Sequence, residues 1–176
     1  YLFFSINFPN NYPYLPPTIK YHSQNNIRIH PNIYVNGKVC LSILGTWSGP
    51  EWTPAMDIIN VLITIQSLLD SCPLRHEPGY DTNSGRYKNL FDRYNRIIEF
   101  NTIKSLILSR LNVDLGNFSI FNNIINETFK KNKQMIHDKI QSNIEDNSLV
   151  SIPLYHISEC IDYNNLYKVF KKFDLK

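Results

Sequence analysis

The sequence contains few cysteines, and none of them lies close to another. Three occur in 176 residues, at Cys40, Cys72 and Cys160. Their odd number and wide spacing differ from the disulfide framework of a small secreted protein and indicate a reducing, intracellular compartment. They also lack the short spacing of zinc knuckles, and the five histidines do not pair with them at ligand spacing. We therefore expect neither structural disulfides nor a bound metal.

Long apolar runs and a strong excess of one charge are also absent. No apolar stretch approaches the roughly 20 residues that a membrane-spanning helix requires. The 18 basic and 15 acidic side chains give a formal net charge of +3, so nucleic acid and anionic membranes are not expected partners. The first residues, YLFFSINFPNN, have neither the basic segment nor the small-residue cleavage site of a signal peptide. These features favour a cytoplasmic or nuclear protein.

The apolar pattern predicts strands first and helices afterwards. Strands are expected over residues 1–8 and 18–22, and a short β-like segment over 38–43. Helices are expected over residues 53–70, 86–111, 119–142 and 158–173, with a loop over 145–155. For the first helix, Thr53 is the expected N-cap and Pro54 the first helical residue. This order indicates an α+β fold with separate strand and helix regions. Because a sheet rarely begins on its first residue, we also expect the protein to continue upstream.

The surroundings of Cys40 indicate a particular chemistry. No acidic residue lies between Asn7 and Glu51, so no local anion opposes formation of a thiolate. The chain shows no Cys-His-Asp order that would indicate a protease. Asn32, eight residues before the cysteine, carries an amide N–H that can stabilise an oxyanion during acyl transfer. A cysteine with such an amide and no dedicated base suits exchange between thioesters.

Four ordered motifs give the region a resemblance to the active-site region of ubiquitin-conjugating enzymes. That family carries FPxxYPxxPP, then HPN, then an acceptor cysteine followed by Leu-x-Ile-Leu, then a Trp-Ser/Thr-Pro-Ala loop. The corresponding residues here are Phe8–Pro17, His30-Pro31-Asn32, Cys40–Leu44 and Trp52–Ala55. Each motif is weak alone, but four in the right order and spacing are specific. The lengthened loop with two tryptophans, followed by IQSLL and EPGY, resembles the large, atypical Z-type members.

The resemblance implies a ubiquitin-conjugating fold and a thioester carrier that needs no cofactor. Cys40 would accept ubiquitin, or a ubiquitin-like modifier, from an activating enzyme and pass it to a lysine of a protein substrate or to a ubiquitin ligase. Asn32 would stabilise the oxyanion or hold the loop over the cysteine. The remaining residues with an implied role are His30 and Pro31 in the supporting loop, Glu77 or Asp81 as an acidic group near the acceptor, and Tyr14, Trp52, Pro54 and Ala55 in a ligase-docking surface.

The resemblance covers roughly residues 1–100 and has departures. The first helix and first two strands of the family are expected upstream. Arg75-His76-Glu77 stands where relatives of this type tend to have Asn before the Glu. We expect a conjugating core over residues 1–111 and a helical extension over residues 112–176 packed on it.

Several alternatives stay open from the sequence. Asn32 is equally suited to a structural role, because Asn often bonds local backbone in turns. Trp52 can cover the core next to the helix instead of binding a partner. A catalytically inactive ubiquitin-binding or scaffold module of the same fold is the alternative function, and the presence of Cys40 argues against it.

Overall fold

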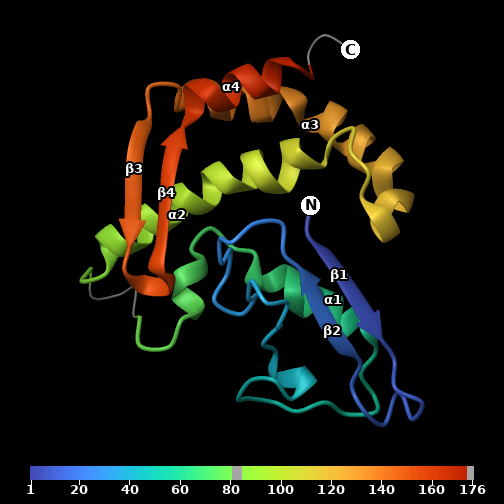
Figure 1. The fold of residues 1–176 in the computed structure, drawn as a ribbon. Coiled ribbons are helices and arrows are strands. Elements are labelled where there is room, and N and C mark those ends of the chain that lie inside the picture. Colours follow the sequence, from blue (N-terminus) through green and yellow to red (C-terminus); the bar gives the residue numbers. More distant parts are fainter. Residues whose placement is uncertain (81–84, 174–176) are drawn as a thin grey trace. The chain divides into compact units, whose positions relative to one another are not determined.

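The computed structural model describes residues 1–80 and 85–173, which pack as two compact units (Figure 1). We call Leu2–Phe91 the N-terminal unit, and Tyr1 together with Asp92–Lys176 the C-terminal unit. The boundary falls inside helix α2 (Lys88–Asn101), whose first turn belongs to the N-terminal unit. The expected division into a core over residues 1–111 and a packed extension over residues 112–176 stays a prediction.

The N-terminal unit begins with an antiparallel hairpin of β1 (Phe3–Asn7) and β2 (Thr18–His22). Phe3 lies opposite His22 and Asn7 opposite Thr18, which confirms both predicted strands. Gly37, with a φ of 96°, lies against the hairpin and accepts a hydrogen bond from the backbone N–H of Tyr21 at 2.9 Å. A Cβ at this glycine would lie 2.9 Å from the Tyr21 carbonyl oxygen, so a larger residue would push the two segments apart.

The segment around Cys40 is less regular than the predicted β-like run. Lys38 and Val39 form only single bridges, to Lys20 and Ile33, and the short 3-10 helix η1 (Ser42–Leu44) follows. The Thr46 hydroxyl accepts from the backbone N–H of Leu41 at 2.9 Å and donates to the carbonyl of Val39 at 2.8 Å. This side chain satisfies backbone groups that a strand would pair, so the chain turns here instead of extending.

Helix α1 (Ile58–Leu68) begins four residues later than predicted, with Asp57 in place of Thr53 as the N-cap. Asp57 is its N-cap and accepts from the backbone N–H groups of Ile59 and Asn60, while the Asn60 side chain accepts from the backbone N–H of Asp57. This reciprocal pair satisfies the free N–H groups of the first turn. The prediction of Thr53 as the N-cap is therefore wrong. Thr53 instead closes a turn by accepting from the N–H of Met56.

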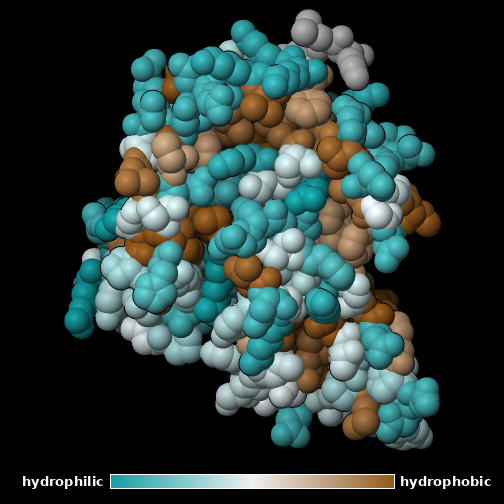
Figure 2. Space-filling view, in the orientation of Figure 1, coloured by the Kyte–Doolittle hydropathy of each residue, from teal (hydrophilic) through white to brown (hydrophobic). Residues whose placement is uncertain are grey.

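The C-terminal unit is mainly helical. After α2 come the π-helical segment η3 (Thr102–Ile107), the 3-10 helices η4 (Leu108–Arg110) and η5 (Gly116–Phe121), α3 (Asn122–Ser142) and, last, α4 (Tyr163–Lys171). Residues 86–111 and 119–142 are thus largely helical, as predicted. Helices α3 and α4 pack against each other, with the rings of Phe129 and Phe170 6.2 Å apart. Figure 2 shows hydrophilic side chains over the outer side of α4 and hydrophobic ones beneath it.

A second hairpin replaces a predicted loop and part of a predicted helix. Strands β3 (Asn147–Ile152) and β4 (Ile157–Asp162) pair antiparallel, from Asn147 opposite Asp162 to Ile152 opposite Ile157. The loop predicted over residues 145–155 and the helix start predicted at residue 158 are therefore wrong. Among the described residues, no helix is both long and apolar enough to cross a membrane.

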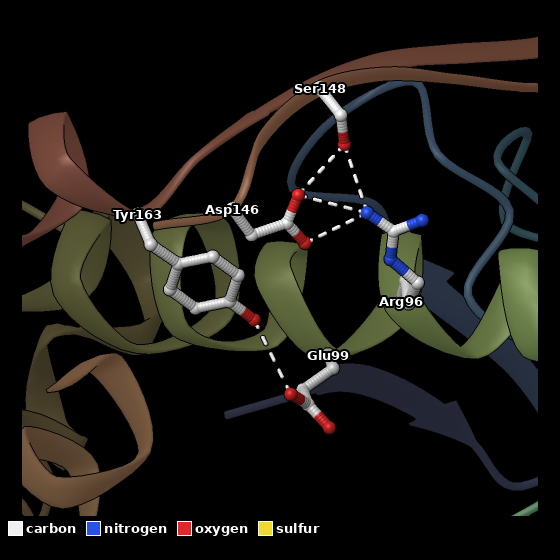
Figure 3. A network of polar contacts seen from close by, with 5 residues as sticks. All are labelled: Arg96, Glu99, Asp146, Ser148 and Tyr163. Atoms are coloured by element: carbon white, nitrogen blue, oxygen red, sulfur yellow. Dashed lines mark hydrogen bonds and ion pairs between the residues drawn. The ribbon is translucent and has the colours of Figure 1, made fainter. Parts of the chain in front are cut away.

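A polar network joins α2 to this hairpin and to α4 (Figure 3). One guanidinium nitrogen of Arg96 donates to both carboxylate oxygens of Asp146 at 2.8 Å and to the Ser148 hydroxyl at 2.9 Å. Tyr163 donates its hydroxyl hydrogen to Glu99 at 3.3 Å. Partial burial alone would raise the pKa of Asp146, but the hydrogen bonds from Arg96 and Ser148 and the charge of Arg96 hold it below its ordinary value.

The charge of Asp146 is expected to stabilise the protein only above acidic pH. Because its pKa is lowered in the folded state, its contribution is present above the ordinary carboxyl range and is lost as the pH falls below about 4. Asp146→Asn should lower the unfolding free energy at pH 7 by less than about 1 kcal/mol, since Arg96 is about half exposed. Urea unfolding at pH 7 and pH 3 measures this, with the exposed Asp92→Asn as control. A difference as large at pH 3 as at pH 7 would contradict the electrostatic origin.

Candidate active site

His30 anchors the turn that carries Asn32. Its ring is fully buried, and its Nδ1 accepts from the backbone N–H of Asn32 at 3.0 Å. The His30 carbonyl accepts from the N–H of Ile33 at 3.0 Å. Burial, and after it the neighbouring His76, lower the pKa of His30 to about 4. His30 is therefore neutral near pH 7 and positions backbone rather than exchanging protons.

Two hydrogen bonds hold Cys40 against Asn32. The backbone N–H of Cys40 donates to the Asn32 carbonyl at 2.8 Å, and the Asn32 side-chain amide donates to the Cys40 carbonyl at 2.8 Å. The Asn32 Oδ1 is buried without a hydrogen-bond partner in the described part of the chain. An amide nitrogen carries two hydrogens, so one N–H of Asn32 secures the backbone and the other can donate to a reacting group.

The Cys40 side chain is shielded from solvent. Only 1% of the residue is exposed, whereas Cys72 is half-buried and Cys160 is exposed. The two residues that flank it, Val39 and Leu41, are also buried. Because the backbone of Cys40 is held on both sides, a reagent can reach its sulfur only when neighbouring side chains or loops move aside.

We expect the three thiols to differ in alkylation rate in the order Cys160, Cys72, Cys40. Access decides this order, and Cys40 should react at least about tenfold more slowly than Cys160. A time course with iodoacetamide, read by mass spectrometry of the three peptides, measures it. The urea-denatured chain is the control and should lose the difference. Fast labelling of Cys40 in the folded protein would show that its side chain is open in solution.

The two predicted docking loops are joined to each other. The indole N–H of Trp52 donates to the carbonyl of Pro13 at 2.7 Å, and its ring lies 6.0 Å from that of Tyr12. Trp52 is half-buried, whereas Tyr14 is 74% exposed and Pro54 and Ala55 are also exposed. Trp52 thus holds the loops together, and the other three residues are free to contact a partner.

A histidine and a carboxylate that the sequence did not single out for function lie close to His30. The Nε2 of His76 is 3.0 Å from Oδ2 of Asp70, and the rings of His76 and His30 are 4.9 Å apart. Asp70 is itself held by the backbone N–H of Cys72 at 2.7 Å. Partial burial would raise the pKa of Asp70, but the hydrogen bonds from Cys72 and His76 keep it below its ordinary value.

His76 also lines an open groove of about 430 Å³ in the N-terminal unit. The other residues along this groove are Trp47, Arg75, Glu77, Pro78, Gly79 and Tyr80. The predicted acidic residue Glu77 therefore lies beside His76 in the same groove. Asp81, the other candidate for this role, lies outside the described residues. The substitution of His for the Asn of relatives was the only sequence signal at this position.

Comparisons with known proteins agree with the resemblance. The model of the family described as "Ubiquitin-conjugating enzyme" matches residues 1–102. The chain is 44% identical over 115 residues to ubiquitin-conjugating enzyme E2 Z of Xenopus tropicalis, which covers 63% of this chain and 36% of that protein. It is 44% identical over 106 residues to the human E2 Z, covering 59% and 29% of the two chains.

Two further matches are also described as ubiquitin-conjugating enzymes. A probable ubiquitin-conjugating enzyme E2 25 of Arabidopsis thaliana is 49% identical over 88 residues, covering 47% of this chain and 14% of that protein. The E2 domain of a Toxoplasma gondii ubiquitin-conjugating enzyme is a solved structure with a TM-score of 0.44 and 28% identity, covering 59% of this chain and 67% of that chain. In the two Z-type relatives, the region that matches this chain covers about a third of the protein's length or less.

Proposed function

Because the chain belongs to the ubiquitin-conjugating enzyme family, with an α+β fold, we propose that Cys40 carries ubiquitin or a ubiquitin-like modifier as a thioester. In the first step, Sγ of Cys40 attacks the C-terminal carbonyl of the modifier. This attack displaces the cysteine sulfur of the activating enzyme. In the second step the acyl group passes to a lysine of a protein substrate or to a ligase cysteine, and the Cys40 thiol is restored. Transfer between two cysteines conserves the thioester, whereas transfer to a lysine converts it into a more stable amide.

The observation that carries this proposal is the pair of hydrogen bonds between Asn32 and Cys40. They hold the Asn32 amide against the backbone of Cys40, eight positions away along the chain, and its second N–H has no partner among the described residues. A donor in this position can stabilise the negative oxygen that forms when the thioester carbonyl is attacked. The buried, neutral His30 stabilises the turn that carries Asn32, because its ring accepts a hydrogen bond from the backbone N–H of Asn32.

The burial of Cys40 adds a requirement to the proposal. Its sulfur is shielded in this structure, so binding of the activating enzyme or of the modifier must move neighbouring groups aside. Ligases would contact the joined loops at Tyr14, Pro54 and Ala55, with Trp52 holding the loops in register. Exposed aromatic residues such as Tyr14 are typical anchors of protein interfaces.

A charging assay tests the proposal. The complete protein encoded by the gene is mixed with an activating enzyme, ATP and ubiquitin, and separated on a non-reducing gel. We expect an adduct that dithiothreitol removes. Ubiquitin-like modifiers with their own activating enzymes are run in parallel, because the modifier class is part of the proposal. No adduct with any of them would contradict the thioester role.

The shielding of Cys40 favours a second candidate, a non-catalytic module that binds ubiquitin or serves as a scaffold. In that case no adduct forms, but ubiquitin still binds. Titration of isotope-labelled ubiquitin with the protein, followed by NMR, separates the two candidates, because only binding would be seen for the non-catalytic module.

A further inference from the structure

The Asp70–His76 pair has the geometry of an oriented base. The carboxylate of Asp70 only accepts hydrogen bonds, so the Nε2 that faces it at 3.0 Å carries the hydrogen. In the neutral ring the lone pair is then on Nδ1. Within the described residues, Nδ1 has no hydrogen-bond partner, and the side chain is 29% exposed. A histidine fixed at one nitrogen by a carboxylate, with the other nitrogen open, is the arrangement that accepts protons in many active sites.

The groove that His76 lines is linked to the segment around Cys40 by two series of contacts. On one side Trp47 follows Thr46, whose hydroxyl bonds the backbone of Val39 and Leu41, the neighbours of Cys40. The Cys40 carbonyl also accepts from the side chain of Asn32.

The second connection runs through the histidines. The ring of His76 packs 4.9 Å from that of His30, which accepts from the Asn32 N–H. Both connections lie entirely within the N-terminal unit. Two residues of the groove therefore adjoin the residues that hold Cys40: Trp47 follows Thr46 in the chain, and His76 packs against His30.

We propose that His76, oriented by Asp70, is the proton acceptor for the amine that attacks the thioester on Cys40, and that the groove beside it receives the acceptor lysine side chain. This inference rests on the proposed function. The lysine nitrogen bonds to the carbonyl carbon, and the negative charge moves to the oxygen. A proton of the attacking nitrogen passes to Nδ1 of His76. The bond to Sγ then breaks with its electron pair on sulfur, which regains a proton, and an isopeptide is released.

The charged and titratable groups around His76 are compatible with this role. Asp70 faces its Nε2, and His30 faces its ring but is neutral near pH 7 because of burial. Arg75 lies on the preceding residue and Glu77 on the following one, both along the groove. Arg28 lies close enough to His30 to influence its charge, and its guanidinium donates to the Pro31 carbonyl. Glu77 is the competing base, and the experiment separates the two.

The experiment follows single-turnover discharge of the charged, complete protein to free lysine, scored as thiol-resistant lysine–modifier product. His76→Asn should charge as the wild type does but discharge about 10²-fold more slowly at pH 7.5. The ratio of wild-type to variant rates should rise with pH and then level, because only the neutral ring can accept a proton. This ratio cancels the titration of lysine itself. Asp70→Asn should show a smaller loss of about tenfold, because the ring is held less firmly.

Two further measurements exclude a merely structural effect. Added imidazole should restore isopeptide formation several-fold in His76→Ala but not in Asn32→Ala. His137→Asn, which changes a histidine of α3, should leave rate and profile unchanged, and melting temperatures should stay within a few degrees. Glu77→Gln should keep the pH dependence of the wild-type discharge rate, because His76 is still present.

Each outcome decides the proposal. A charged His76→Asn that discharges at the wild-type rate, or a rate ratio that does not change with pH, overturns the role of His76 and leaves the thioester function intact. A wild-type protein that never charges overturns both. A slow variant with the predicted pH dependence and imidazole rescue supports the role of His76.

Discussion

Cys40→Ala is expected to abolish the thiol-labile adduct completely in the charging assay. Without Sγ no atom at this position can form the acyl bond, so the loss is absolute rather than partial. Cys40→Ser should instead give an adduct that resists dithiothreitol, because an oxyester exchanges with thiols far more slowly than a thioester. The measurement is a pair of gels, with and without reductant, over a time course of charging.

The other two cysteines provide the matched controls. Cys72→Ala and Cys160→Ala should both charge like the wild type, although Cys160 is the most exposed thiol of the three. Charging that survives Cys40→Ala and disappears with Cys160→Ala would show that accessibility, and not the motif around Cys40, selects the acceptor.

Asn32→Ala is expected to slow discharge to free lysine by about 10² to 10³, the cost of removing one oxyanion donor. Charging should survive, because the attacking thiolate is supplied by Cys40. The same change also removes the bond to the Cys40 carbonyl. Loss of a buried hydrogen bond costs about 1 to 3 kcal/mol, so the melting temperature should fall as well. Single-turnover discharge and thermal melts, measured on one preparation, report the two effects separately.

Asn36→Ala is the matched control for this prediction. Asn36 is exposed, and within residues 1–80 and 85–173 its side chain bonds only the local backbone, through its Oδ1 and the N–H of Lys38. Its replacement should leave discharge unchanged. If Asn32→Ala lowers the melting temperature but discharges at the wild-type rate, Asn32 serves only to hold the Cys40 backbone.

Local patterns predicted the elements whose signals are contained in a few neighbouring residues. The alternation of Phe4 and Ile6 with polar residues indicated β1, and the apolar spacing of Val61, Ile65 and Leu68 indicated α1. The start of α1 was misplaced because Thr53-Pro54 and Asp57 both carry helix-start signals. Only the hydrogen bonds between Asp57 and Asn60 distinguish the true cap.

The hairpin of β3 and β4 could not be predicted from neighbouring residues alone. Its connection places Tyr155 at φ 62° and His156 at φ 52°, a conformation that usually requires glycine or asparagine. The turn contains neither of these residue types, so its sequence does not indicate the conformation. The ladder from Asn147–Asp162 to Ile152–Ile157 and the bonds of Asp146 to Arg96 stabilise the turn from outside it. The bond between Arg96 and Asp146 joins residues 50 positions apart, which no local pattern contains.

The sequence by itself determined the family, the order of its motifs and the residue types around Cys40, because each motif is a short string whose spacing is fixed along the chain. Only the tertiary structure decided that Cys40 is shielded, that one N–H of Asn32 is committed to its backbone, and that His76 meets Asp70 beside the groove. Burial and side-chain pairing depend on how distant segments pack. A motif therefore identifies its residues but does not predict how buried they are or which groups they bond.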